Sequence, residues 1–286
     1  MKIHHFAAGT LCPRVGRLIT GKGGLFDEVR MVCHCLLVES DSGLILVDTG
    51  MGTADLADPR ARLGKGFAAM MRPRRDPSET ALAGVERLGF SARDVRHLIV
   101  THLDLDHAGG LPDFPEASVH IFAAEHEAAM ARATVFEKER YRPAHWAHGP
   151  KWVRYRVQGD AWLGFECVRQ LEGLPPEVLL VPVTGHTRGH VAVAVRQSGG
   201  GADWVLHAGD AYFHHDEVHA QARRCPVGLE LFQRTVAYDR ASWSRNQTRL
   251  RELVHTHGRA HAAAGAETVE VFCAHDPGEL DRLAAV

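Results

Sequence analysis

The chain contains no apolar run long enough to cross a membrane, and residues 1–9 show no stretch typical of a secretory signal peptide. We therefore expect a cytoplasmic protein that has no membrane partner. Long runs of like charge are also missing, and the net charge is near zero, with 33 Lys and Arg residues against 35 Asp and Glu residues. The basic cluster at 72–75 is short, and we expect no nucleic-acid partner.

Cysteine is scarce and scattered, with six cysteines spread over 286 residues. Cys33 and Cys35 share one face of a strand-like segment, but no second pair accompanies them. This favours buried, reduced thiols over a cysteine metal site. With 45% hydrophobic residues the chain can bury one large core, so we expect a single domain over residues 1–286.

The order of apolar runs and turn signals predicts a sheet-rich α/β fold. Residues 31–40 and 44–48 flank an Asp-Ser-Gly turn and indicate a β-hairpin. Further strands are expected at 96–100, 117–122, 178–183, 191–195, 204–206 and 268–272, helices at 76–89, 91–94, 124–133 and 240–257, and a glycine turn at 199–201. This order fits two mixed sheets with helices outside them, a four-layer αββα sandwich.

One long connection stands out from this pattern. The segment 136–159 is rich in aromatic and basic residues and has no clear periodicity. Long irregular connections in compact domains are commonly functional. The segment is therefore either a cap over the active site or a packed surface loop.

Four metal-competent side chains fall within six positions of the stretch 101–110: His102, Asp104, Asp106 and His107. Alternate residues share one side of an extended segment, whereas on a helix they point apart. The first three can therefore converge in an extended loop, and His107 joins them if the chain turns at the following Ala-Gly-Gly. On this stretch alone, a solvated polar turn is the alternative.

Further His and Asp side chains follow the ends of other predicted strands, flanked by small residues that allow close backbone approach. They are Asp48, His186, His190, Asp210 and His275. Asp48 by itself is equally compatible with a turn that closes its own loop.

Taken together, these segments resemble the metallo-β-lactamase superfamily, which includes class B β-lactamases, hydroxyacylglutathione hydrolases and acyl-homoserine lactonases. The matching motifs are VDTG at 47–50, THLDLDHAGG at 101–110, GHTRGH at 185–190, AGD at 208–210 and AHDP at 274–277. They occur in the order typical of that family and cover nearly the whole chain, so the resemblance also implies the four-layer fold.

The resemblance implies a site for two divalent metal ions. One metal would be held by His102, Asp104 and His186, and the second by Asp106, His107 and His275, with Asp210 bridging both. Asp48 would orient ligands from behind. His190 matches a position that is not normally a ligand, and we expect it to be structural or to contact a ligand.

Position 104 departs from the family pattern, which usually has histidine there. With Asp104, three carboxylates and a bridging hydroxide would neutralise two divalent cations, whereas histidine would leave one net positive charge. The family favours zinc, but the added charge makes Mn or Fe possible. Arg188 stands where many relatives have proline, and it would either bind an anionic substrate group or offset the charge of Asp104.

The implied activity is hydrolysis of a small ester or lactone by a hydroxide that bridges the two metals. Asp106 would accept the proton of the attacking water, and either a metal-bound water or Asp210 would protonate the leaving group. Tyr212 is either a hydrogen-bond donor to the developing oxyanion or a core tyrosine. The alternatives are a thioesterase of the hydroxyacylglutathione hydrolase kind and an iron-dependent oxidoreductase of the same fold. The expected partner is a small acyl substrate, and a homodimer is possible.

Overall fold

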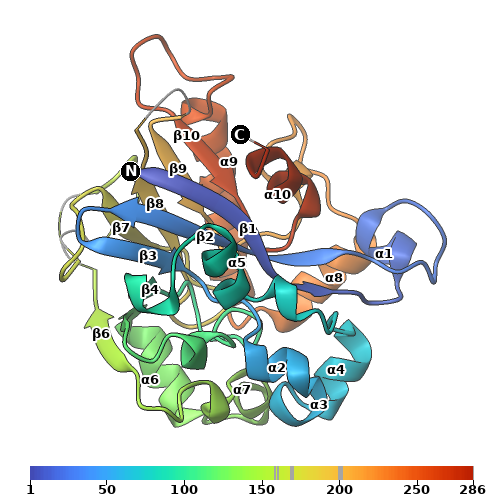
Figure 1. The fold of residues 1–286 in the computed structure, drawn as a ribbon. Coiled ribbons are helices and arrows are strands. Elements are labelled where there is room, and N and C mark those ends of the chain that lie inside the picture. Colours follow the sequence, from blue (N-terminus) through green and yellow to red (C-terminus); the bar gives the residue numbers. More distant parts are fainter. Residues whose placement is uncertain (158, 160, 168–170, 199–201, 286) are drawn as a thin grey trace.

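The computed structural model describes residues 1–286 except 158, 160, 168–170, 199–201 and 286 (Figure 1). The first sheet has the order β1-β2-β3-β4-β5-β6 and the second has the order β10-β9-β8-β7. The strands are β1 Lys2–Leu11, β2 Met31–Ser40, β3 Gly43–Val47, β4 Val95–Ile99, β5 Ser118–Phe122, β6 Lys151–Tyr155, β7 Val178–Pro182, β8 Val191–Arg196, β9 Trp204–His207 and β10 Val269–Phe272. Both sheets are mixed: β3 to β6 pair in parallel, as do β9 and β10, and the remaining neighbours are antiparallel.

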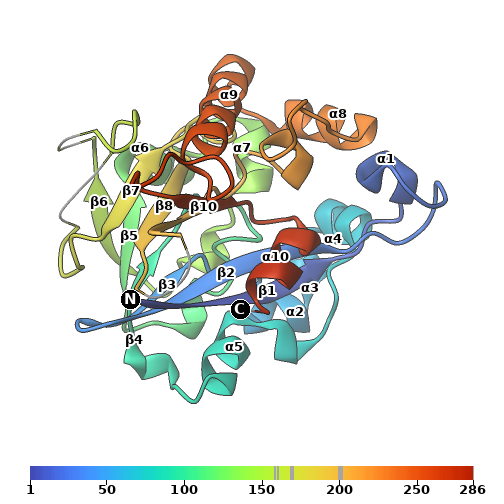
Figure 2. The ribbon, with the colours of Figure 1, turned by 90° about the horizontal axis from the view of Figure 1, so that it is seen from above.

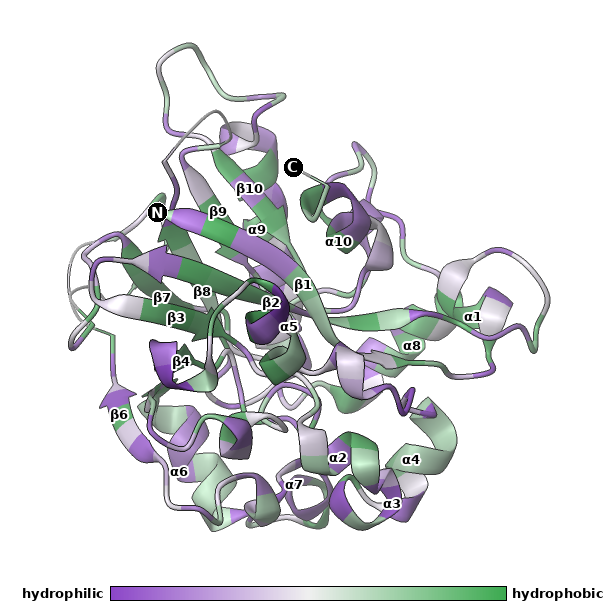
Figure 3. Cartoon of the chain, in the orientation of Figure 1, coloured by the Kyte–Doolittle hydropathy of each residue, from purple (hydrophilic) through white to green (hydrophobic). Residues whose placement is uncertain are grey.

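The two sheets face each other across a shared apolar layer. This layer contains Leu36, Val38, Ile45, Val47 and Ile99 from the first sheet and Val178, Leu180, Val191, Val193, Val205 and Phe272 from the second. Continuous apolar runs suit strands that are covered on both faces, and β3, β7 and β8 are accordingly largely hydrophobic in Figure 3.

Helices cover the outer face of each sheet. Helix α5 (Ala81–Arg87) packs beside β1, α6 (Ala123–Ala131) packs on β5 and β6, and α9 (Arg240–His257) packs on β10. Figure 2 shows α5 and α9 on opposite sides of the paired sheets. The other helices are α1 Gly16–Thr20, α2 Thr53–Ala57, α3 Pro59–Arg62, α4 Lys65–Met71, α7 Val135–Arg140, α8 Val227–Val236 and α10 Pro277–Leu283. The predicted four-layer αββα sandwich is therefore confirmed. Among the described residues, none of the helices is both long and apolar enough to span a membrane.

Most predicted elements are present, with local differences. The hairpin pairs β2 with β3, and α9 has the predicted bounds of 240–257. The helix predicted at 76–89 is instead divided into a short 3₁₀ turn, Pro77–Glu79, and α5, because Thr80 adopts an extended conformation and its side chain accepts a hydrogen bond from Ala83 N. The sequence interpretation missed strands β1 and β6 and helices α1 to α4, α7, α8 and α10. The glycine turn at 199–201 lies outside the described residues.

The loops that follow β3, β4, β7, β9 and β10 meet at one edge of the sandwich. Backbone hydrogen bonds connect them: Thr49 N donates to His107 O, Val191 N to Thr101 O, and Ala274 N to Gly209 O. A loop that carries a polar motif is thus fixed against a loop from a distant part of the chain. This edge holds every metal-competent motif predicted from the sequence.

Candidate metal centre

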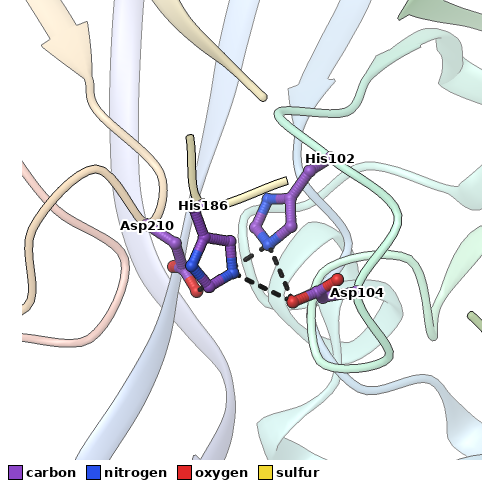
Figure 4. Close-up of side chains that lie close together, drawn as sticks. All are labelled: His102, Asp104, His186 and Asp210. Atoms are coloured by element: carbon purple, nitrogen blue, oxygen red, sulfur yellow. Dashed lines mark hydrogen bonds and ion pairs between the residues drawn. The ribbon is translucent and has the colours of Figure 1, made fainter. Parts of the chain in front are cut away.

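The seven predicted metal ligands converge in the structure. The side chains of His102, Asp104, His186 and Asp210 form one group whose potential ligand atoms lie within 4.8 Å of one another (Figure 4). A second group of the same kind contains His107, Asp210 and His275, and Asp106 lies beside His275 in a third. All seven side chains are buried.

Asp210 lies between the two groups. Its Oδ2 atom is 3.3 Å from His186 Nε2 and 3.7 Å from His102 Nε2. Its Oδ1 atom is 3.2 Å from both His107 Nε2 and His275 Nε2. Each carboxylate oxygen thus faces one group, which is the geometry needed for a ligand shared by two ions.

The side chains present fit a pair of divalent metal ions. His102 Nε2, His107 Nε2 and Asp210 Oδ1 are buried atoms that form no hydrogen bond among the described residues. Buried polar atoms normally have a partner, so three such atoms in one cluster indicate a missing ligand. Imidazole nitrogens with carboxylate oxygens form a donor set suited to zinc and to harder divalent metals.

Asp48 lies behind the cluster and orients one histidine of each group. Its Oδ1 accepts a hydrogen bond from Thr101 N at 2.8 Å, and its Oδ2 accepts one from His107 Nδ1 at 2.9 Å and one from Thr101 Oγ1 at 2.8 Å. Because the single hydroxyl proton of Thr101 is used in this way, Thr101 Oγ1 must accept a hydrogen bond from His102 Nδ1, 2.9 Å away. Both histidines therefore carry a proton on Nδ1 and can present Nε2 to a metal. The expected role of Asp48 agrees with these contacts.

Two further contacts fix neighbouring groups. His275 Nδ1 donates to Val32 O at 2.8 Å, which leaves its Nε2 facing the cluster. His190 Nε2 accepts a hydrogen bond from Asp210 N at 2.9 Å, while its Nδ1 donates to Val183 O at 3.2 Å. Both ring nitrogens of His190 are thus used, so it supports Asp210 and is not a ligand, in agreement with its expected structural role.

Glu125 is a supporting residue that the sequence interpretation missed. This buried carboxylate accepts hydrogen bonds from Leu103 N, Thr187 Oγ1 and Gly189 N at 3.0, 2.6 and 3.0 Å. It therefore connects the loop after β4 to the loop after β7. A glycine is required at 189, because a Cβ there would lie 2.1 Å from Glu125 N.

The charges of the cluster are strongly coupled. Burial raises the pKa of Asp210, but His275, His107 and His186 outweigh this effect and hold it well below its ordinary value. Burial lowers the pKa of His107, yet Asp210 and Asp48 raise it well above the usual range. The pKa of His275 is also raised, since Asp210 outweighs its burial. Carboxylates and imidazoles of the cluster thus stabilise each other's charged forms.

Arg140, at the end of α7, is a second contributor that the sequence interpretation missed. Its Nε lies 3.1 Å from Asp104 Oδ1. Burial raises the pKa of Asp104, but Arg140 and His102 outweigh it and hold that pKa well below its usual value. No local pattern marks this arginine, because the contact depends on how α7 packs across the loop of His186.

Arg188 takes neither of the roles expected for it. Its Nε pairs with Glu137 Oε1 at 2.9 Å, and its guanidinium lies 4.2 Å from the centroid of the Tyr238 ring. It makes no ion pair with Asp104 and does not line the cavity above the cluster. The prediction that Arg188 offsets Asp104 is therefore wrong, and Arg140 is the arginine beside this carboxylate.

Tyr212 is a core residue, so the predicted oxyanion role is also wrong. The side chain is fully buried in the core beneath the second sheet, and its hydroxyl donates to Glu279 Oε1 at 3.0 Å. The same oxygen lies 3.1 Å from His219 Nε2. The turn after Asp210 directs Tyr212 away from the cavity.

Cys33 lies closer to the cluster than its sequence context suggested. Its Sγ is within 4.8 Å of the ligand atoms of Asp106 and His275. Burial, followed by Asp106, raises the pKa of the thiol well above its usual value. Both Cys33 and Cys35 are buried and free of disulfide bonds, as predicted.

A cavity of about 250 Å³ opens above the cluster. Asp104, Asp106, His186, Asp210 and His275 line it on the polar side. The apolar lining comes from Leu11, Met31, Phe67, Met70, Met71, Leu105, Phe136, Phe213, Phe232 and Val236. Helices α4, α7 and α8 thus form much of the wall, although none of the three was predicted.

The segment 136–159 is only partly the predicted cap. Its first residues, among them Phe136 and Arg140, line the cavity. Farther along, buried His145 contacts Asp55 Oδ1 at 3.1 Å, and β6 extends the first sheet. The segment therefore combines a cavity wall with an edge strand, because its aromatic residues pack in more than one place.

Comparison with known proteins supports this arrangement. Residues 29–256 match the family model described as the metallo-beta-lactamase superfamily. A probable metallo-hydrolase from Mycobacterium tuberculosis is 40% identical over 284 residues, which cover 99% of this chain and 83% of that protein. An N-acyl homoserine lactonase from Bacillus cereus is 29% identical over 162 residues, or 56% of this chain and 57% of that protein.

Solved structures share the fold. An N-acyl homoserine lactone hydrolase with N-hexanoyl-L-homoserine bound at its catalytic metal centre has a TM-score of 0.70 and 21% identity, covering 98% of this chain and 95% of that chain. The dizinc quorum-quenching lactonase AidC has a TM-score of 0.58 and 18% identity, with coverage of 97% and 90%. From the family match and the close similarity to a metallo-hydrolase, we conclude that this chain belongs to the metallo-β-lactamase superfamily and is one of its metallo-hydrolases.

Proposed function

We propose that this protein hydrolyses a small ester or lactone at a centre of two divalent metal ions. The observation that carries the proposal is the position of Asp210, whose two oxygens face two separate groups of ligands at the base of an apolar cavity. His102, Asp104 and His186 would hold one ion, Asp106, His107 and His275 the other, and Asp210 both. When bound, such ions supply hydroxide near neutral pH and polarise a carbonyl group.

The residues of the chain supply binding, orientation and proton transfer. The apolar wall, to which Phe136 and Phe232 contribute, favours an acyl group and excludes water from the reacting carbonyl. Asp106 lies at the cavity surface, where it can accept the proton of an attacking water. Asp210 also borders the cavity, and it can relay the proton taken up by Asp106 to the leaving oxygen.

Lactones are favoured over other esters by the relatives named above. N-acyl homoserine lactonases match about half of this chain by sequence, and a lactone hydrolase of this fold carries its acyl product at the metal centre. The cavity is mainly apolar with polar groups at one side, as an acyl substrate requires. Zinc is the metal that we expect, and elemental analysis of protein expressed without added metal would identify it.

The proposal is tested by measuring the hydrolysis of lactones, aryl esters, thioesters and a chromogenic cephalosporin by the metal-loaded protein. We expect turnover of lactones or aryl esters, and its loss in His186→Ala, which removes a proposed ligand. The matched control is His97→Ala, because His97 is a partly buried histidine that bonds His120, outside the cluster. Turnover of thioesters alone would favour a thioesterase, and no turnover of any carbonyl substrate would contradict the proposal.

A further inference from the structure

The two oxygens of Asp104 face different partners. Oδ2 lies 3.0 Å from His186 Nε2 and 3.5 Å from His102 Nε2, and Figure 4 shows both imidazoles on that side. Oδ1 instead lies 3.1 Å from Arg140 Nε and forms no hydrogen bond. One oxygen is thus directed at the ligand group, while the other faces a cation.

Arg140 is held in place independently of this carboxylate. Its Nη1 donates to His186 O at 2.8 Å, and its Nη2 donates to Val236 O at 2.7 Å. The guanidinium also lies 4.9 Å from the centroid of the Phe136 ring, and the residue is 8% exposed. Two backbone carbonyls from separate parts of the chain therefore fix a positive charge beside Asp104.

The other charged groups along the cavity wall nearby do not neutralise Arg140. Glu139 and Arg142 also line the cavity, but they pair with each other at 3.0 Å. Asp104 is the carboxylate that forms an ion pair with Arg140 in the described part of the chain. The two residues therefore act as a pair that is neutral in sum.

We propose that Arg140 is a positioning residue that compensates for the carboxylate at 104. It holds Asp104 with Oδ2 toward His102 and His186, and it cancels the negative charge that aspartate adds where the family usually has histidine. The Asp104–Arg140 pair thus stands in for one neutral ligand, and the centre retains one net positive charge. This inference rests on the two-metal site of the proposed function. It replaces the expectation that Asp104 makes the centre more negative.

The first test is a double-mutant cycle read out by metal binding. Dissociation constants for zinc are measured by competition with a chromophoric chelator for the wild type, Asp104→His, Arg140→Met and Asp104→His/Arg140→Met. In Asp104→His, the fixed guanidinium stays beside the metal without its carboxylate, so we expect affinity to fall at least about tenfold. Arg140→Met removes an unpaired cation in that background and should restore about tenfold. In the wild-type background it removes the contact that orients Asp104, and it should weaken binding. An equal effect of Arg140→Met in both backgrounds would overturn the proposal.

The second test separates charge from packing. In Arg140→Met, the uncompensated carboxylate should shift the acidic limb of the kcat/KM profile upward by about one pH unit. Arg140→Lys keeps the charge but not the forked contacts, so its profile should stay near that of the wild type even if its rate falls. If Arg140→Met and Arg140→Lys lose the same rate and neither changes the pH profile of kcat/KM, Arg140 contributes packing alone.

Separate controls distinguish a loss of folding from a loss of metal binding or activity. Thermal unfolding of the metal-free variants shows whether Arg140→Met still folds, and Arg140→Lys provides a variant that retains the cation. The metal titrations need no substrate, so they decide the role of Arg140 even if every ester and lactone in the panel proves inert. If the protein hydrolyses its substrates but the substitutions at 104 and 140 affect zinc affinity independently, the proposed function stands and only this inference is overturned.

Discussion

Asp48→Asn tests how one carboxylate controls both metal groups. The substitution is nearly isosteric, and asparagine tolerates the left-handed backbone conformation at this position, where φ is 56°. The amide oxygen would stay opposite Thr101 N, which places the amide NH₂ at the Oδ2 position. There it would meet His107 Nδ1 and Thr101 Oγ1, which both donate to Oδ2 in the wild type.

Both histidine tautomers should therefore invert in Asp48→Asn. His107 would have to accept at Nδ1 and carry its proton on Nε2, and Thr101 would donate to His102 with the same result. A proton on Nε2 blocks the ligand atom, so we expect each site to lose about 10- to 100-fold in affinity, or about 1.4–2.7 kcal/mol.

Calorimetric titration of the metal-free protein with zinc measures both sites. Asp55→Asn is the matched control, because Asp55 is a fully buried carboxylate that contacts His145 at 3.1 Å outside the cluster. It should lower thermal stability without changing metal affinity. Wild-type affinity at both sites in Asp48→Asn would refute the relay through Thr101.

Two other predictions concern proton release and Tyr212. Because the pKa values of His107 and His275 are raised in the metal-free protein, zinc must displace protons from them as it binds. Affinity should rise with pH, and the stability that these protons give the metal-free form is present below about pH 6.5 and lost as pH rises through the higher folded pKa values. Heats of zinc binding that do not vary among buffers of different ionisation enthalpy would contradict this. Tyr212→Phe should cost about 1–3 kcal/mol of unfolding free energy, measured with denaturant, because Glu279 loses a hydrogen bond, while kcat stays unchanged. A large fall in kcat would instead support a catalytic role for Tyr212.

The ligands could be predicted because each lies just after an apolar strand. In His102, Asp106 and Asp210 the signal is local: a strand delivers the side chain to the sheet edge, and small neighbours allow the loops to meet. The layer order followed from the same strands. The helix predicted at 76–89 is a counterexample. A single extended residue, Thr80, divides it into a 3₁₀ turn and α5.

The residues that support the ligands could not be predicted in the same way. Arg140 and Glu125 act through contacts between distant loops, and neither stands in a recognisable motif. Arg188 was chosen because it lies inside a motif, yet its side chain turns toward Glu137. Motif position predicts where the backbone goes. The direction of a long side chain depends on the packing of the elements around it.

The convergence of ligands at one edge also means that bound ions would connect the two sheets. His102 and Asp106 follow a strand of the first sheet, whereas His186, Asp210 and His275 follow strands of the second. Bound ions would hold the two sheets together at that edge. The opposite edge, near Gly43 and Val178, would lack this link, so its backbone should fluctuate more. We therefore expect slow backbone amide exchange to be concentrated in the loops that carry the metal ligands.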